Sequence, residues 1–384
     1  MTDTTAATAS PAVDGARRTG PVGVGVIGAG VISDQYLSNL TVFPDVEVRF
    51  IADIDEPRAA AQAEKWGVAG SGSVEQLLAD DDIEIVVNLT IPAAHVEVAL
   101  QVLAAGKHVW GEKPYALDRA SAAELRDAAR AAGKTVSVAP DTFLGAGLQT
   151  ALRVVREGRI GTPLNGLTLF QSPGPESWHP SPEFLFAHGA GPLFDIGPYY
   201  ITTLVQAFGP VAKVTATASK ARATRTIGSG PKAGTEFPVE VPTNHSALIQ
   251  FEHGGSAQSV FSFESDRGRT GFVEIAGETG TVVFPDPNEF DGDTELYAHG
   301  AEEAETIPAV GSTYSRGTGV VDLARSLRAG EENRVPGALA FHVLDVMVSI
   351  AEAAERGETV LVESTVEPSP TLPEGWDPAA STLS

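Results

Sequence analysis

The chain of 384 residues has no cysteine and only two methionines. Without cysteine there is no disulfide framework, no zinc–thiolate site and no thiol nucleophile. Basic residues are also scarce, since 26 lysines and arginines are set against 50 aspartates and glutamates, and the formal net charge is −24. A chain this acidic is a poor non-specific ligand for nucleic acid or anionic membranes. We therefore expect no nucleic-acid partner, and we expect any anionic cofactor to be bound by local donors.

Long apolar runs are missing too. No stretch reaches the roughly 18 apolar residues of a membrane span, so no membrane partner is expected. Residues 1–20 lack an apolar signal core, and a glycine-rich strand directly follows the pair Arg17-Arg18, where an export signal would have its cleavable segment. We expect a disordered leader over residues 1–20, a loosely held extended tail over residues 366–384, and a soluble cytoplasmic protein.

The length predicts two domains, and the texture of the sequence changes near residue 141. Before that point, apolar strands alternate with helices. The predicted strands are 22–27, 46–52, 83–89, 108–110 and 135–139, and the predicted helices are 58–66, 73–79, 94–105 and 119–132. This alternation is typical of βαβ units and a parallel sheet. We predict an α/β domain over residues 21–141.

The second half reads differently. We predict a helix over 148–157, strands over 164–170, 212–219, 244–252, 257–263, 271–276 and 281–284, and helices over 319–329 and 338–356. Several of the strands alternate apolar and polar residues, as strands with one buried face do. We predict an α+β domain with a large, mainly antiparallel open sheet over residues 142–365.

A glycine turn lies between the first strand and the helix that follows it. Its pattern is Gly28-x-Gly30-x-x-Ser33, with a small serine at the position of the usual third glycine. Glycines at these positions permit a tight turn and let a pyrophosphate approach the helix N-terminus. The sequence therefore predicts a Rossmann dinucleotide site at Gly28 and Gly30 and the adjoining Val31 and Ile32.

Asp53 ends the second predicted strand and is followed by Ile54. A carboxylate there can accept the hydroxyls of an adenosine ribose and repel a 2′-phosphate, which favours NAD over NADP. Asp53 could instead cap the next helix. Arg58 argues against a strict preference for NAD, because an arginine near the ribose can bind a 2′-phosphate.

Three longer motifs carry a family resemblance. They are Ile-Val-Val-Asn-Leu-Thr-Ile-Pro-Ala-Ala-His over 85–95, Gly-Lys-His-Val-Trp-Gly-Glu-Lys-Pro over 106–114, and Gly-Ala-Gly-Pro-Leu-Phe-Asp-Ile-Gly-Pro-Tyr over 189–199. Together they resemble the signatures of the Gfo/Idh/MocA family of sugar and cyclitol dehydrogenases, over roughly residues 22–365. Most members have a histidine where this chain has Tyr199. A tyrosine at this position resembles the glucose–fructose oxidoreductase branch of the family.

The resemblance implies roles for individual residues. Lys113 would hydrogen-bond the reacting oxygen beside the nicotinamide, and Glu112 would bind the nicotinamide ribose. Asp195 would hold the substrate next to Lys113, although it could also cap a helix. Thr90, Pro92 and His95 would line the cofactor cleft; His95 opens a helix and could serve only to cap or pack.

Three roles are open for Tyr199. A tyrosine with an ordinary pKa of about 10 is a poor base at neutral pH, but a nearby cation such as Lys113 favours the phenolate. Tyr199 could take the hydroxyl proton while Lys113 polarises the oxygen, or Lys113 could move the proton while Tyr199 orients the substrate. A purely structural tyrosine at the start of an apolar helix is the third reading.

Two loops supply substrate candidates. The segment 175–180 contains Glu176, Trp178 and His179, which could bind sugar hydroxyls and stack on a sugar ring. Asp141 stands where many relatives have an asparagine followed by an arginine, and the loss of that arginine favours a neutral substrate. We predict no metal site, because His179, His188 and Asp195 lack the spacing of metal ligands.

The predicted protein is an NAD-dependent dehydrogenase or reductase for a secondary hydroxyl or ketone of a sugar, cyclitol or glycoside. In the family the open sheet packs against another subunit, which implies a homodimer or homotetramer. Two alternatives belong to other classes. A hydrolase could use NAD transiently to cleave glycosides, or a non-catalytic regulator could bind the dinucleotide alone.

Overall fold

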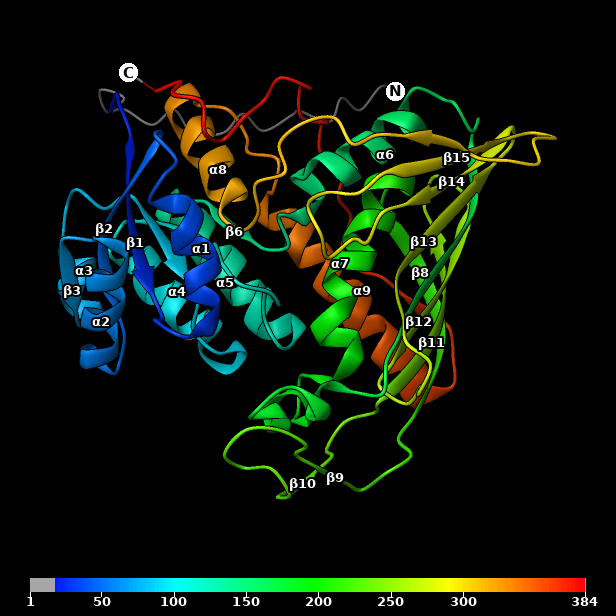
Figure 1. Ribbon diagram of the computed structural model, residues 1–384, viewed down its shortest axis with the longest axis horizontal. Helices are drawn as coiled ribbons and strands as arrows, with labels where there is room; N and C mark the ends of the chain where they lie inside the picture. The colour runs from blue at the N-terminus through cyan, green and yellow to red at the C-terminus, as the bar shows by residue number, and fades with distance from the viewer. Residues whose placement is uncertain (1–17, 384) are drawn as a thin grey trace, which may run out of the picture.

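The computed structural model describes residues 18–383, and its first half is built on a parallel sheet (Figure 1). The strands are β1 (Val22–Ile27), β2 (Val46–Ala52), β3 (Gly70–Gly72), β4 (Ile85–Asn88), β5 (His108–Gly111) and β6 (Val136–Val138). Their spatial order is β3-β2-β1-β4-β5-β6, so the chain runs outward from β1 to one edge and then returns to β4 and runs to the other. Ligands of such sheets bind where the strand order reverses, at the carboxyl ends of β1 and β4.

The helices of this half connect the parallel strands. They are α1 (Val31–Leu40), α2 (Glu56–Trp66), α3 (Val74–Leu78), α4 (His95–Ala104) and α5 (Arg119–Ala132). The sequence did not predict the three-residue strand β3, but the other strand and helix positions agree with the predictions to within about two residues. Helix α2 begins two residues earlier than predicted, because the Asp55 side chain caps it and Pro57 suits its first turn.

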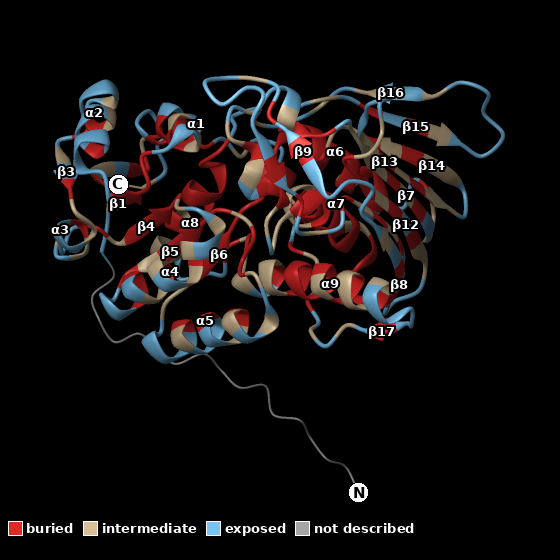
Figure 2. Ribbon diagram, turned by 90° about the horizontal axis from the view of Figure 1, so that it is seen from below, coloured by how far each residue is buried: buried red, intermediate tan, exposed pale blue. Residues whose placement is uncertain are grey.

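The second half forms a nine-stranded sheet with helices on one face. Its helices are α6 (Ala146–Arg156), α7 (Gly191–Phe208), α8 (Thr318–Ala329) and α9 (Gly337–Arg356). Its strands are β7 (Pro163–Gln171), β8 (Val211–Ser219), β11 (Asn244–Phe251), β12 (Ser256–Ser262), β13 (Arg269–Gly277), β14 (Gly280–Phe284), β15 (Thr294–Ala298), β16 (Glu305–Ile307) and β17 (Val360–Leu361). The order is β16-β15-β14-β13-β7-β12-β11-β8-β17, and every pair is antiparallel except β7 with β12. Figure 2 shows α7 as a largely buried helix beside this sheet and α9 as a half-buried one.

A small lobe extends from the second half. It contains the short strands β9 (Thr224–Thr226) and β10 (Glu236–Pro238) and the single-turn helices η3 (Pro175–Ser177) and η4 (Pro182–Phe186). In Figure 1 it lies at the end of the molecule where α7 begins. The sequence did not predict β9, β10, β15, β16 or β17, because each is short and carries no sustained alternation.

Helix α7 differs most from the prediction. The sequence predicted a helix starting near Tyr199, with Asp195 as a possible cap before Gly197-Pro198. The helix instead begins at Gly191 and runs through Pro198. Most of its residues are buried, and this packing outweighs the hydrogen bond that Pro198 cannot donate.

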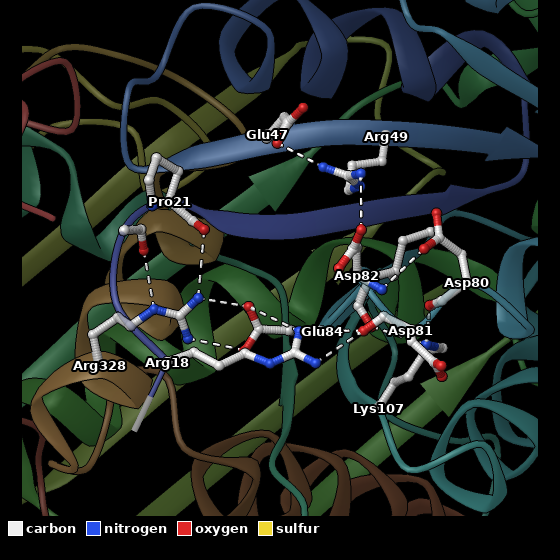
Figure 3. Close-up of polar contacts among 12 residues, drawn as sticks. Arg18, Pro21, Glu47, Arg49, Asp80, Asp81, Asp82, Glu84, Lys107 and Arg328 are labelled. Carbon is white, nitrogen blue, oxygen red and sulfur yellow. Dashed lines mark hydrogen bonds and ion pairs between the residues drawn. The ribbon is translucent and has the colours of Figure 1, made fainter. Parts of the chain in front are cut away.

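Helix α8 belongs to the second half of the chain but packs against the first sheet. Arg328 at its carboxyl end pairs with Glu84 beside β4 at 2.5 Å and donates to the Gly20 carbonyl at 3.0 Å (Figure 3). At its amino end Gly319 lies against Trp110, so closely that a Cβ would sit 2.0 Å from the indole ring. Helix α8 therefore completes the core of the first domain.

The tail also returns to the first domain. Residues 366–383 form no helix or strand, but the expectation of a loosely held segment is wrong. The fully buried Asp45 accepts hydrogen bonds from Thr382 and from the Leu383 amide, and it pairs with Arg325 at 2.7 Å. Trp376 lies 4.8 Å from the Arg325 guanidinium. Of the expected leader, residues 1–17 lie outside the described part of the chain.

Among the described residues, only α9 is long and apolar enough to cross a bilayer. Half of its residues are buried in the protein, where it packs on β8 and α7. Its apolar composition is that of a core helix.

Candidate active site

The glycine turn after β1 leaves an open bed at the carboxyl edge of the first sheet. Gly28 has φ +105°, and a Cβ there would lie 2.7 Å from the Leu89 carbonyl oxygen. Gly30 has open space around it and caps α1 without a side-chain hydrogen bond, so the first amides of α1 keep their donors for a ligand.

Exposed apolar residues surround this turn. Val31, Ile54 and Ile91 follow β1, β2 and β4, and they are 91%, 97% and 68% exposed. Ile32 is half-buried beside Val31. Large apolar side chains gathered at one sheet edge are typical of a ligand-binding surface. The donors of α1 and this apolar surface fit the pyrophosphate and adenosine of a dinucleotide.

Asp53 lies where the ribose prediction places it, but its oxygens already have partners. Its carboxylate accepts from the amides of Ala29 and Asp55 at 2.7 and 2.9 Å. Arg58 donates two further bonds, at 2.6 and 3.2 Å. Burial raises the pKa of Asp53, but these donors outweigh it and hold the pKa below its usual value, so the carboxylate is ionised. A ribose reaches it only when Arg58, which is 49% exposed on its side chain, moves aside.

His95 does not face the cofactor bed. It is the first residue of α4 and is buried, and its ring nitrogens lie 3.0 Å from the carbonyl oxygens of Pro114 and Thr90. Burial lowers the pKa of His95, and the two carbonyl acceptors oppose this only in part. The predicted cofactor contact of His95 is therefore not supported by the structure, because both ring nitrogens lie against carbonyl groups of two loops at the sheet edge. Thr90 and Pro92 stay partly exposed there.

Glu112 follows β5 and is held by the first half of the protein. It accepts 2.7 Å from the Tyr36 hydroxyl, which in turn accepts from Trp110 at 3.3 Å. Its second oxygen accepts from the Lys113 amide at 3.2 Å. Tyr36 was missed by the sequence analysis, and its place on the core-facing side of α1 is the only signal that indicated it.

Lys113 and Asp195 come together as the resemblance implied. Lys113 Nζ donates to Asp195 Oδ1 at 2.7 Å and to the Asp195 carbonyl oxygen at 2.8 Å. An ammonium has three donors, so one remains for a ligand. Burial lowers the pKa of Lys113, but the charge of Asp195 and the Tyr199 hydroxyl outweigh it and raise the pKa above its ordinary value.

Tyr199 completes this group. The Lys113 ammonium lies 5.6 Å from the centre of its ring, and the hydroxyl accepts a hydrogen bond of 3.0 Å from Arg316. Burial raises the pKa of Tyr199, while the cations Lys113 and Arg316 lower it in part. The three predicted catalytic residues are therefore neighbours, and Arg316 is a fourth that the sequence analysis missed.

Asp141 does not reach the site where a substrate would bind. It is fully buried, and its Oδ2 accepts from the amides of Gly317 and Gly319 at 3.1 and 3.0 Å. Its predicted substrate role is wrong, because Oδ2 is bound by these amides and Oδ1 lies in the interior, 3.8 Å from Arg316 Nη1. Burial raises its pKa, and Arg316 lowers it in part.

The loop 175–180 divides its three candidates. Glu176 pairs closely with the buried Arg225 and so holds the lobe together, which contradicts its predicted substrate role. Trp178 is 68% exposed, and His179 lies against both Trp178 and Phe184 at 5.5 Å. These two side chains stay available to a ligand. Across residues 18–383, no three His, Asp or Glu side chains gather as metal ligands would.

Comparisons with known proteins identify both halves of the chain. A model of an oxidoreductase family with an NAD-binding Rossmann fold matches residues 22–140, and a model of the GFO/IDH/MocA C-terminal domain matches residues 148–283. The 1,5-anhydro-D-fructose reductase of Ensifer adhaerens is 28% identical over 266 residues, covering 67% of this chain and 74% of that protein. Inositol 2-dehydrogenase 3 of Saccharopolyspora erythraea is 33% identical over 161 residues, covering 41% of this chain and 48% of that protein.

Solved structures share the fold. The levoglucosan dehydrogenase complex with NADH has a TM-score of 0.78 and 22% identity, covering 90% of this chain and all of that one. The two family models together span more than half of the sequence, in the order of the two sheets. The chain therefore belongs to the Gfo/Idh/MocA family of oxidoreductases.

Proposed function

We propose that the protein is an NAD-dependent dehydrogenase or reductase for a secondary hydroxyl or ketone of a sugar, cyclitol or glycoside. The observation that carries the proposal is the contact of Lys113 with both Asp195 and the ring of Tyr199. A cation, a carboxylate and a phenol grouped beside a dinucleotide bed are the parts that alcohol oxidation needs. When bound, the nicotinamide accepts or gives the hydride at the carbinol carbon.

The free N–H of Lys113 donates to the reacting oxygen of the substrate. Because the pKa of Lys113 is raised, its ammonium stays charged and polarises that oxygen. Tyr199 takes the hydroxyl proton during oxidation and returns it during reduction. Asp195 holds Lys113 in place and accepts from a neighbouring substrate hydroxyl.

NAD is the proposed cofactor, with NADP less favoured. The ionised Asp53 repels a 2′-phosphate, and it accepts ribose hydroxyls once Arg58 has moved. Thr90, Pro92 and Glu112 line the nicotinamide end of the bed.

The substrate is proposed to be neutral. The position after Asp141 holds a threonine, and the nearby Arg316 is buried with its bonds directed to protein groups. The exposed Trp178 offers a flat apolar face on which a sugar ring can stack.

A panel of sugars, inositols and glycosides with NAD⁺ and NADP⁺, followed by absorbance of the reduced nicotinamide, tests the proposal. We expect NADH formation with at least one neutral polyol. Product release from the glycosides is measured in parallel, because a hydrolase that uses NAD transiently would release sugar without net NADH. A regulatory protein would bind NADH and turn over nothing, which would contradict the proposal.

We also propose a homodimer or homotetramer formed through the open face of the second sheet. Val260, Leu169 and Phe272 lie side by side there on β12, β7 and β13, and each is partly exposed. Leu248 on β11 is exposed as well. A partly apolar sheet face of this kind is suited to a second copy of the chain.

A further inference from the structure

Arg316 is a buried arginine that forms no hydrogen bond with a carboxylate. Two other arginines of low exposure do form such bonds: Arg325 meets Asp45 at 2.7 Å and Arg334 meets Asp322 at 2.6 Å. Burying a charge is costly, and a close ion pair is the usual compensation. The different partners of Arg316 therefore require an explanation.

Its hydrogen bonds go to neutral groups. Nη2 donates to the Tyr199 hydroxyl at 3.0 Å and to Asn288 Oδ1 at 3.3 Å. Nη1 lies 3.8 Å from Asp141 Oδ1, and neither atom has a hydrogen-bond partner. Asp141 therefore lies close to the guanidinium without drawing it away from the tyrosine.

The backbone around Arg316 is fixed from two sides. Asn39 on α1 donates to the Arg316 carbonyl oxygen at 2.8 Å. Asp141 accepts from the amides of Gly317 and Gly319. The side chain is thus brought to Tyr199 by a segment anchored to the first domain, and its position does not depend on Tyr199 itself.

The contact constrains the phenol. Arginine has no acceptor, so the proton of the Tyr199 hydroxyl must point away from the guanidinium. Lys113 and Arg316 face Tyr199 as cations and favour the phenolate, whereas Glu112 and Asp195 oppose it. Burial also opposes the phenolate. Removing one of the two cations should therefore raise the pKa of Tyr199 further.

We propose that Arg316 is a positioning residue of the reaction: it orients the Tyr199 hydroxyl and stabilises the phenolate that accepts the substrate proton. Arg316 itself neither gains nor loses a proton in the reaction. In oxidation the proton moves from the substrate hydroxyl to the Tyr199 oxygen, and in reduction it moves back. This inference rests on the proposed function.

The first test is the pH profile of kcat/KM at saturating NAD⁺. Arg316→Gln keeps amide donors but loses the charge, and we expect a rate about 10- to 100-fold lower, with the break of the profile moved to higher pH. NADH affinity should stay within about twofold of the unmodified protein, because Arg316 acts on the tyrosine. Arg159→Gln, at an exposed pair with Glu305, is the matched control and should change neither the rate nor the break.

Arg316→Lys separates charge from geometry. The lysine keeps the cation, so the break should stay in place while the rate falls about tenfold for want of the fixed guanidinium donor. Equal rates for Arg316→Lys and the unmodified protein would overturn the proposal. A loss that is the same at every pH in Arg316→Gln would also overturn it, since a merely structural arginine gives that result.

A second measurement does not need a substrate. The ultraviolet absorbance of tyrosinate is titrated in the full chain and in Tyr199→Phe, and the difference isolates Tyr199. Arg316→Gln should move this signal to higher pH, and an unmoved signal contradicts the inference. Because the titration is independent of turnover, it keeps a failure of this inference distinct from a failure of the proposed function.

Discussion

Lys113 Nζ lies 2.7 Å from Asp195 Oδ1, and this contact joins the first domain to a helix of the second. Lys113 follows β5 at the carboxyl edge of the parallel sheet, and Asp195 lies in the second turn of α7. The reactive group thus forms only when both halves are folded and docked.

Replacing Lys113 by methionine should abolish most turnover and leave cofactor binding intact. The substitution removes the charge that polarises the reacting oxygen, and a loss of about 100- to 10,000-fold in kcat/KM is expected. NADH binding is followed by fluorescence, and Lys213→Met on the exposed side of β8 is the control. Retention of more than about a tenth of the activity would contradict the role of Lys113.

The oxidation rate should rise with pH across the neutral range. Phenolate is the basic form of Tyr199, and burial raises the pKa of Tyr199 above its ordinary value, so the phenol dominates at neutral pH. Each rise in pH therefore increases the competent fraction. A histidine base would instead level off above pH of about 6.5. A plateau there would mean that another group takes the proton.

Arg58 should control the choice between the two cofactors. Arg58→Ala leaves the Asp53 carboxylate uncompensated, so NADPH binding should weaken by about tenfold or more, whereas NADH binding is kept or improved. Asp53→Ser should have the opposite effect on preference. Fluorescence titrations with both reduced cofactors measure the ratio. If Arg58→Ala left the ratio unchanged, the pairing with Asp53 would have no part in recognition.

Asp45→Asn should destabilise the protein by about 3–5 kcal/mol, because it leaves Arg325 without its buried partner. Burial raises the pKa of Asp45, but Thr382, Leu383 and Arg325 outweigh it, and the pKa is lowered. The ionised Asp45 therefore contributes fully to the free energy of unfolding above its unfolded pKa of about 3.9. This contribution is lost as the pH falls through the lower pKa of Asp45 in the folded protein. Urea unfolding at neutral and acid pH measures it, with the exposed Glu305→Gln as a control expected to cost less than about 1 kcal/mol. Equal effects of the two variants would rule out the buried pair as the cause.

Leu169→Glu should dissociate the proposed oligomer. The charge would be placed at the centre of the apolar row on the open sheet face, where a second copy would bury it. Light scattering after size exclusion gives the mass, and Leu248→Glu, at an exposed position of β11 on the same sheet face, tests how far the interface extends. An unchanged mass for Leu169→Glu would exclude this face.

Local signals account for the parts that the sequence predicted well. A few adjacent residues are enough to predict each alternating strand and helix, the Gly28 turn and the Glu112-Lys113 motif. The structure has them at the expected positions. Helix α7 was placed incompletely because Pro198 is a helix breaker by propensity, and only tertiary packing shows that it is tolerated.

The remaining site residues depend on distant contacts. Arg316 meets Tyr199 across 117 positions of the chain, and Asn39 meets the Arg316 carbonyl across 277. No spacing rule connects such pairs. Asp141 and Glu176 were misassigned for the same reason. Asp141 binds the start of α8 and Glu176 pairs with Arg225, and both partners are distant in the sequence.

The return of α8 and the tail to the first sheet has a consequence for synthesis. A ribosome releases the glycine turn and all six parallel strands long before it makes the helix that covers Trp110 or the residues that bind Asp45. The nucleotide-binding half therefore waits, with part of its core uncovered, until the last residues emerge. A chain cut between the two sheets should accordingly expose apolar surface and aggregate, even though each sheet is continuous in sequence.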